Sequence, residues 1–209
     1  MIGRTLAVAA TVVAAGILAG SAGAGPVDKP PKGPEPVVFA TEAMEQSFDT
    51  AGRPLGPPRP VAAADHRPTA ADRAAEVSQG PPVRQLESHG TSGCRQVQIT
   101  RIGRSLFGLE LFRYWQTKYW CWNSGHTVYN LQIGASGSTS DPTWFYRGTI
   151  SSQGWPYTWC CSNGSSGHYS FRQGKFEQVV LGKTLSAKYP WVKIWAYGNG
   201  GYSYDTGGT

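Results

Sequence analysis

From residue 94 to the end of the chain, short runs of aromatic and β-branched residues alternate with clusters of glycine and serine. The clusters recur about every 8 to 20 residues, and the runs between them lack a sustained 3.6-residue periodicity. This pattern predicts an all-β domain over residues 94–209, built as a single antiparallel β-sandwich or a barrel-like sheet. We expect strands at Arg95–Ile102, Leu109–Trp122, Thr127–Ile133, Trp144–Ile150, Tyr157–Cys161, Tyr169–Gln173, Phe176–Leu181 and Trp191–Tyr197. The two strands that flank Gly174 would also fit one bulged strand.

The hairpin around residues 123–125 has two possible registers, and the side-chain pattern of its strands distinguishes them. A two-residue loop mixes polar and apolar side chains on both faces, whereas a three-residue loop pairs Cys121 with Thr127 and separates them. In the selected register, one face carries cysteine, aromatic and aliphatic residues, including Trp115, Thr117, Tyr119 and Cys121, and is expected to be the core. The opposite face carries Tyr114, Gln116, Lys118, Trp120, Trp122, His126, Asn130 and Gln132.

The last predicted strand divides in the same way. Val192, Ile194 and Ala196 fall on one side, and rings alternate with a lysine on the other. Rings with amide and lysine neighbours stack on sugars and hydrogen-bond their edges, although a second sheet that covered them would explain the same residues. The ligand-binding residues that we expect are Trp120, Trp122, Tyr114, Lys118, Trp191, Lys193, Trp195 and Tyr197.

An apolar leader opens the chain. Arg4 precedes an uncharged run at residues 6–19, and Ala22-Gly23-Ala24 fits the small-x-small pattern of signal peptidase sites. We therefore expect residues 1–24 to be a cleaved signal peptide and the protein to be secreted. The run is too short and alanine-rich for a transmembrane anchor.

Residues 25–93 contain twelve prolines, with Phe39 and Phe48 as their only aromatic residues. So little apolar surface does not offset the entropy lost when a backbone becomes ordered. The composition predicts a disordered proline-rich spacer or a removable pro-segment. Within it, Val37–Phe48 is expected to form a helical turn or two when bound to a partner.

All four cysteines and all eight tryptophans lie beyond residue 93. An even set in an exported domain predicts two disulfides. The Cα atoms of Cys160 and Cys161 stand about 3.8 Å apart, too close for a normal disulfide. Two connectivities then remain, Cys94–Cys160 with Cys121–Cys161, or the crossed version. The spacing matches no metal site, and none is expected.

Charge also distinguishes residues 94–209, which hold eleven Lys or Arg against four Asp or Glu. A basic balance favours solubility, acidic polymers or an anionic membrane, and an exported protein is a poor candidate for nucleic-acid binding. With so few carboxylates, Glu110 and Glu177 are the one plausible pair for a glycoside hydrolase. His126 and His168 adjoin glycine-rich turns and are expected to be structural. We predict no catalytic residues and no cofactor.

Several short motifs occur in a fixed order along residues 94–204. Trp120-Cys121-Trp122-Asn123 precedes a glycine turn, Phe171-Arg172-Gln173-Gly174 follows, and a closing strand reads Pro190-x-Val192-x-Ile194. In this order the chain is similar to uncharacterised exported β-rich proteins of high-GC Gram-positive bacteria. The resemblance implies the fold class and the export address, and it adds no site residues.

These observations together predict a secreted, non-catalytic binding module. Its expected ligand is a polysaccharide or an anionic polymer of the cell envelope. A secreted antagonist, such as a bacteriocin-like toxin or inhibitor that acts on a membrane or a protein, is the first alternative. A hydrolase that uses Glu110 and Glu177 is the second.

Overall fold

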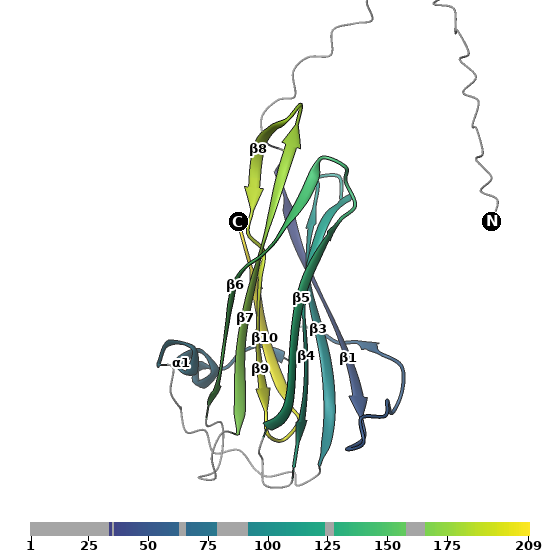
Figure 1. Ribbon diagram of the computed structural model, residues 1–209, viewed down its shortest axis with the longest axis vertical. Helices are drawn as coiled ribbons and strands as arrows, with labels where there is room; N and C mark the ends of the chain where they lie inside the picture. The colour runs from purple at the N-terminus through teal and green to yellow at the C-terminus, as the bar shows by residue number, and fades with distance from the viewer. Residues whose placement is uncertain (1–33, 35, 63–65, 79–91, 124–127, 158–165) are drawn as a thin grey trace, which may run out of the picture. The chain divides into compact units, whose positions relative to one another are not determined.

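Alternating inward and outward side chains organise nearly all of the described chain into strands (Figure 1). The computed structural model describes residues 34, 36–62, 66–78, 92–123, 128–157 and 166–209. The elements are β1 (Val38–Phe48), β2 (Arg59–Pro60), α1 (Ala70–Ser78), β3 (Gly93–Arg104), β4 (Glu110–Trp122), β5 (Val128–Thr139), β6 (Trp144–Tyr157), β7 (Gly167–Val180), β8 (Lys183–Lys188), β9 (Trp191–Tyr197) and β10 (Tyr202–Gly207).

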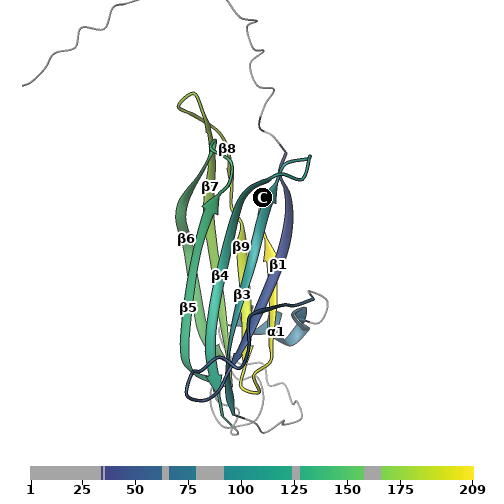
Figure 2. The ribbon, with the colours of Figure 1, turned by 90° about the vertical axis from the view of Figure 1, so that its right-hand side faces the viewer.

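The strands form two antiparallel sheets. Sheet A has the order β2-β1-β3-β4-β5, and sheet B has the order β10-β9-β7-β6, with β8 paired to β7. The sheets lie face to face, sheet A in front of sheet B in Figure 2. The predicted all-β class is therefore confirmed, as two open antiparallel sheets within the described residues. β7 is continuous, so the two strands expected around Gly174 are one.

The core between the sheets is rich in aromatic side chains. Phe112 of β4 stacks on Phe176 of β7 with ring centroids 4.4 Å apart, and Trp144 packs against Phe112 at 4.9 Å. Ile99 of β3 and Ile194 of β9 belong to the same cluster, and both are fully buried. Such large rings are the main stabilising element, because each removes a large apolar area from water.

The expected inner and outer faces of β4 are reversed in the structure. Trp120 and Lys118 point into the core and are fully buried, whereas Thr117 and Tyr119 lie on the outer face and are half-buried. The predicted register is also wrong. Cys121 pairs with Tyr129 rather than Thr127, and a bulge then shifts the pairing by one more residue. Residues 124–127 of the expected loop, His126 included, lie outside the described residues.

β1 corrects the expectation of a disordered spacer. Residues 38–48 pair with β3 along their whole length, so the segment expected to form helical turns is a strand. Its inner face gives Ala43 and Phe39 to the core, and Glu45 bonds Tyr202 of sheet B at 3.1 Å. These few apolar residues suffice because an existing sheet edge supplies the backbone partners and a prepared apolar surface. β2 and α1 also belong to the stretch that we expected to be disordered.

The disulfide pairing is a second correction. Cys94 and Cys121 face each other across β3 and β4 and form a disulfide. If all four cysteines pair among themselves, a Cys94–Cys121 bond leaves Cys160 to pair with Cys161. The sequence did not predict Cys94–Cys121 because that second bond was ruled out. Cys160 and Cys161 lie outside the described residues, as do residues 158–161 of the strand expected after Tyr157.

α1 is fixed against sheet B. Glu76 of α1 forms an ion pair with Lys193 of β9, and Asp72 accepts a hydrogen bond from Ser203 of β10 at 3.3 Å. Asp72 also accepts hydrogen bonds from the backbone and side chain of Thr69 at the start of the helix. Contacts at the N-terminal end of a helix stabilise it locally. The outer side of sheet B is therefore partly occupied by the chain's own helix.

Candidate binding surface

Four of the eight expected ligand-binding residues lie between the two sheets. Tyr114, Lys118 and Trp120 are fully buried between the sheets, and Trp122 is nearly so. Burial raises the pKa of Tyr114 to about 12, against a weaker opposing effect of its hydrogen bond with Thr149. These four side chains do not meet a ligand from solvent, so their assignment to a contact face is wrong.

Lys118 shows how the core accommodates a polar end. Its Nζ donates to the backbone carbonyls of His168 at 2.6 Å and Ile194 at 3.0 Å, on two strands of sheet B. Burial, with the nearby charge of Arg172 as a smaller effect, holds the pKa of Lys118 well below its ordinary value. Lys118 therefore joins the sheets and does not supply charge to an anionic ligand.

The other half of the expected site lies on the outer face of sheet B. The partition predicted for β9 is correct, since Val192, Ile194 and Ala196 face the core. Trp195 and Tyr197 nevertheless pack into a second apolar cluster and are buried. Trp191 and Lys193 are half-buried, with Lys193 Nζ 4.8 Å from the Trp191 ring centre.

The outer face of sheet A carries polar side chains in rows that run across its strands. Residues paired from β1 to β5 form the first row, Gln46, Gln96, Tyr119 and Gln132. The next row in the same direction is Met44, Gln98, Thr117 and Gly134, followed by Glu42, Thr100, Trp115 and Ser136. Strands lie about 4.8 Å apart, and alternate residues along a strand about 7 Å, so the rows make a regular grid of donors, acceptors and rings.

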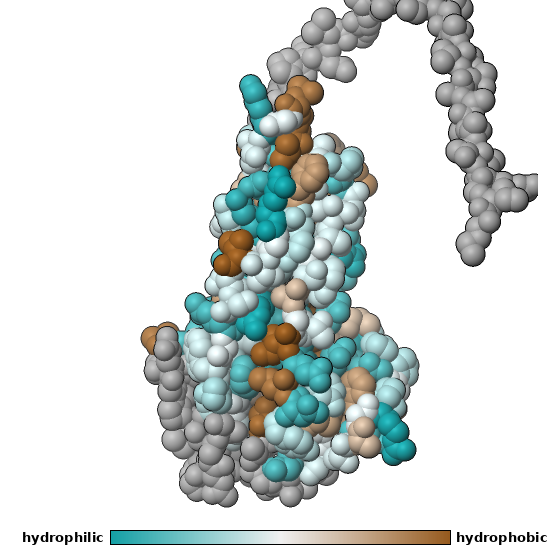
Figure 3. Space-filling view, viewed as in Figure 1, coloured by the Kyte–Doolittle hydropathy of each residue, from teal (hydrophilic) through white to brown (hydrophobic). Residues whose placement is uncertain are grey.

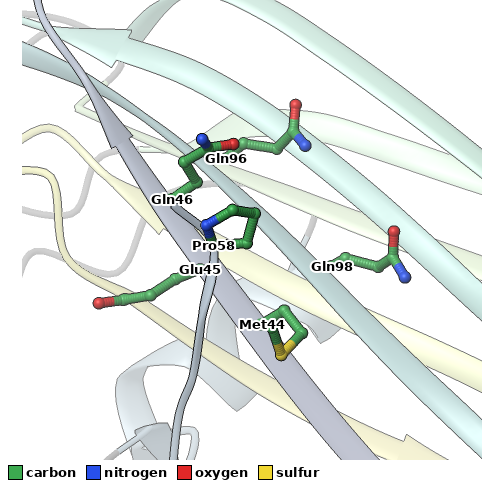
Figure 4. A pocket seen from close by; sticks show the side chains of 6 residues that line it. All are labelled: Met44, Glu45, Gln46, Pro58, Gln96 and Gln98. Atoms are coloured by element: carbon green, nitrogen blue, oxygen red, sulfur yellow. The ribbon is translucent and has the colours of Figure 1, made fainter. Parts of the chain in front are cut away.

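Two shallow hollows lie on either side of Gln96 in this grid. One, of about 250 Å³, is lined by Met44, Glu45, Gln46, Pro58, Gln96 and Gln98, with the Glu45 carboxylate paired to Arg59 (Figure 4). The other, of about 290 Å³, is lined by Gln96, Thr117, Tyr119, Gln132, Ile133 and Gly134. The hollows give the face a relief that an extended ligand can follow.

The amides of the first row have unused hydrogen-bonding capacity. Gln46 donates to the Gly56 carbonyl at 2.8 Å, which fixes its orientation. No hydrogen bond links the side chains of Gln96 or Gln132 to another described residue, and each keeps one acceptor and two donor hydrogens. The first two rows contain no charged residue, and Glu42 in the third pairs with Arg104. We call the three rows the amide face.

The carboxylates do not support hydrolysis. Glu110 and Glu177 lie in different sheets, and each is paired to a base. The Arg113 hydrogen bond lowers the pKa of Glu110, and hydrogen bonds from Lys175 and Arg147 lower that of Glu177. A general acid in a glycosidase needs the opposite shift. Across the described ranges, no three His, Cys, Asp or Glu residues cluster as a metal site would require.

Sequence reasoning missed the amide face because it placed Thr117, Tyr119 and Trp115 in the core. The signal that separates the two faces of β4 is ring size, since Trp120 and Trp122 together offer far more apolar area than Thr117 and Cys121. No sequence pattern indicated that the glutamines of β1 and β3 belong to one surface, because they become neighbours only when the two strands pair.

No model of a known protein family matches the chain, and no curated protein or solved structure matches it either. The described part of the chain has no helix with the length and apolarity of a membrane span.

Proposed function

We propose that the protein is a secreted, non-catalytic module that binds a neutral polysaccharide through the amide face. The row formed by Gln46, Gln96, Tyr119 and Gln132, with a hollow on each side of Gln96, is the observation that carries this proposal. Sugar hydroxyls both donate and accept hydrogen bonds, as a glutamine amide does. Tyr119 and Trp115 add ring surfaces on which the apolar face of a sugar packs.

The neutral character of the face favours an uncharged polymer over an anionic one. The two lysines expected to hold an anionic ligand are engaged elsewhere, Lys118 with backbone carbonyls in the core and Lys193 with Glu76. An acidic polymer would therefore find few cations among the three rows. Uncharged polysaccharides need none.

The proposal is tested by retention on insoluble neutral polysaccharides and on purified cell-wall material. The double substitution Gln96→Ala with Gln132→Ala removes two amides that make no internal bond, so the fold should persist while retention falls at least tenfold. Gln153→Ala, an exposed glutamine of β6 on sheet B, is the matched control and should bind as the parent does. Equal retention of the parent and the double variant would refute the amide face as the site.

A further inference from the structure

Two turns project from the same end of the two sheets. The stacked pair Phe112 and Phe176 marks a common level in sheets A and B. Sheet A continues three residues from Phe112 to Leu109, and sheet B continues five residues from Phe176 to Leu181, or about 10 and 16 Å at the rise of a strand. The β3–β4 turn and the β7–β8 turn therefore both extend beyond the core in one direction (Figure 1).

Both turns carry large apolar side chains into solvent. In the β3–β4 turn, Leu106 is 63% exposed, Phe107 89% and Leu109 69%. At the tip of the β7–β8 turn, Leu181 is 94% exposed, and Val38 lies at the same end because it pairs with Arg104. Figure 3 shows hydrophobic residues at the end where Figure 1 draws the β7–β8 turn. Exposed apolar residues are ordinary when scattered, but here they gather at two tips.

The backbone at Leu181 gives a separate indication. Leu181 has φ 51°, Gly182 has φ 74°, and they form a two-residue loop between Val180 and Lys183. Asn, Asp and Gly are favoured in such hairpin turns, whereas leucine in the left-handed region is strained. Neither backbone conformation nor burial within the protein therefore explains a leucine at this tip. A contact with an apolar environment outside the molecule would explain it.

Basic residues lie near the two tips and behind them. Lys183 follows the Leu181–Gly182 loop directly, and Lys188 lies further back on β8, opposite Phe176; neither forms an ion pair with another described residue. Arg104, beside the β3–β4 turn, pairs with Glu42. The nearby carboxylates are mostly neutralised, Glu110 by Arg113 and Glu177 by two bases, while Asp141 accepts hydrogen bonds from Thr143. The end therefore combines apolar tips with two lysines unpaired among the described residues, against Asp141 as a carboxylate without an ion pair.

We infer that this end docks on the surface of an anionic phospholipid bilayer, with Phe107 and Leu181 in the interfacial layer and Lys183 at the headgroups. Apolar side chains enter this layer to a depth of about 5–10 Å, and clustered basic residues add attraction to anionic lipid. A stable protein partner needs about 20–30 residues on each side, far more than two narrow tips present. The inference is independent of the proposed polysaccharide binding.

The test is co-sedimentation of the chain that begins at Gly25 with phosphatidylglycerol-containing vesicles and with phosphatidylcholine vesicles. We expect at least tenfold stronger partition onto the anionic vesicles. Leu181→Asn with Phe107→Ser should reduce it at least tenfold, because asparagine suits the left-handed turn and neither side chain supports the core. Leu55→Ser is the matched control, since Leu55 is 69% exposed beside Ser47, at the opposite end of β1 from Val38.

Two results would overturn the inference. One is failure of the parent protein to sediment with anionic vesicles, which would also be the outcome if the tips contacted only a protein. The other is equal partition of the parent and the tip variant, or equal losses in the tip variant and Leu55→Ser. A thermal unfolding curve for each variant confirms that the fold persists before partition is compared.

Discussion

Lys118 is a fully buried lysine that has two carbonyl oxygens as partners and no carboxylate among the described residues. Taking an ammonium group out of water is costly, and burial accordingly lowers its pKa. The amine is retained in the core because its hydrogen bonds reach two strands of the opposite sheet. Gln116 makes a similar link from the neighbouring inward position, donating to Ser170 at 2.6 Å.

Removing the Lys118 side chain should therefore destabilise the protein. We expect Lys118→Ala to lower the free energy of unfolding by about 3–5 kcal/mol, through a cavity and an unsatisfied His168 carbonyl. Lys118→Met keeps most of the volume and should cost only about 1–2 kcal/mol. Urea denaturation of both variants measures the difference. Equal stabilities of the parent and Lys118→Ala would contradict the buried position.

His168 should make stability depend on pH. Burial, reinforced by Lys118 and Arg172, lowers the pKa of His168 from 6.5 to about 3. Between these values the unfolded chain binds a proton that the folded chain does not, so stability is lost as pH falls below 6.5. The loss approaches about 1.4 kcal/mol per pH unit.

In the window from pH 6.5 to 4.5 the carboxylates contribute little, because the lowered pKa values of Glu45, Glu110 and Glu177 place their losses mainly below 4.5. Lys118, whose pKa burial also lowers, can add to the slope, but it is present in the parent and in a His168 variant alike, so the difference between the two reports on the histidine. Urea denaturation at several pH values in this window should give a smaller slope for His168→Asn than for the parent. An unchanged slope would mean that another group titrates.

At the level of single residues, the sequence revealed the alternation along β4 but not which side is buried. Lysine and glutamine are usually exposed, so Lys118 and Gln116 point to a solvent face when the sequence is considered alone. Their polar ends are satisfied by sheet B, which no local pattern in β4 can reveal. β9 was divided correctly because Val192, Ile194 and Ala196 have no polar ends to satisfy.

Among the elements, the hairpin of β3 and β4 is closed by the Cys94–Cys121 disulfide, over a sequence separation of 27 residues. In the chain-entropy account, a loop of this length contributes about 3–4 kcal/mol by restricting the unfolded chain. We expect Cys94→Ser with Cys121→Ser to lower the free energy of unfolding by about that amount. Non-reducing peptide mapping should yield a linked peptide containing both cysteines, and a link from Cys94 to Cys160 or Cys161 would contradict the pairing.

The β7–β8 hairpin offers a substitution that should stabilise. Leu181→Asn places a residue that tolerates positive φ where leucine is strained, and it also removes an exposed apolar side chain. We expect the free energy of unfolding to rise by about 1 kcal/mol. Leu185→Asn, on β8 of the same hairpin, is the control and should not stabilise. A destabilised Leu181→Asn variant would show that the leucine has a structural role.

The elements with dense aromatic runs were predictable, and those that depend on a neighbour were not. β4, β6, β7 and β9 were all anticipated, although β6 extends seven residues beyond its expected end at Ile150 and β8 was not expected. β1 was missed because prolines before and after it dominate the composition, and β10 because its glycines resemble a loose terminus. Both strands bury a few residues against a sheet that is already formed, so their own apolar content is low.

At the scale of the whole molecule, the two sheets differ in what covers them. The outer face of sheet B carries a buried aromatic cluster around Trp195 and is contacted by α1. The outer face of sheet A holds the amide face with its two hollows. The apolar tips lie at one end of both sheets, so the two proposed surfaces do not overlap and one chain could use both at once.

The segment before β3 should prove to be part of the folded unit. β1 pairs with residues 94–104 of β3 and also supplies Glu45. Burial raises the pKa of Glu45, but hydrogen bonds from Arg59 and Tyr202 and the charge of Arg95 together hold that pKa below its ordinary value. A chain that starts at residue 92 would lose these partners, expose the β3 edge and leave Arg95 half-buried without its carboxylate. We expect residues 25–209 to be soluble and to unfold cooperatively, and residues 92–209 to aggregate or to lose the transition. Size-exclusion chromatography and thermal unfolding of the two chains distinguish these outcomes. If the truncated chain is as stable as the longer one, residues 25–91 act only as a spacer.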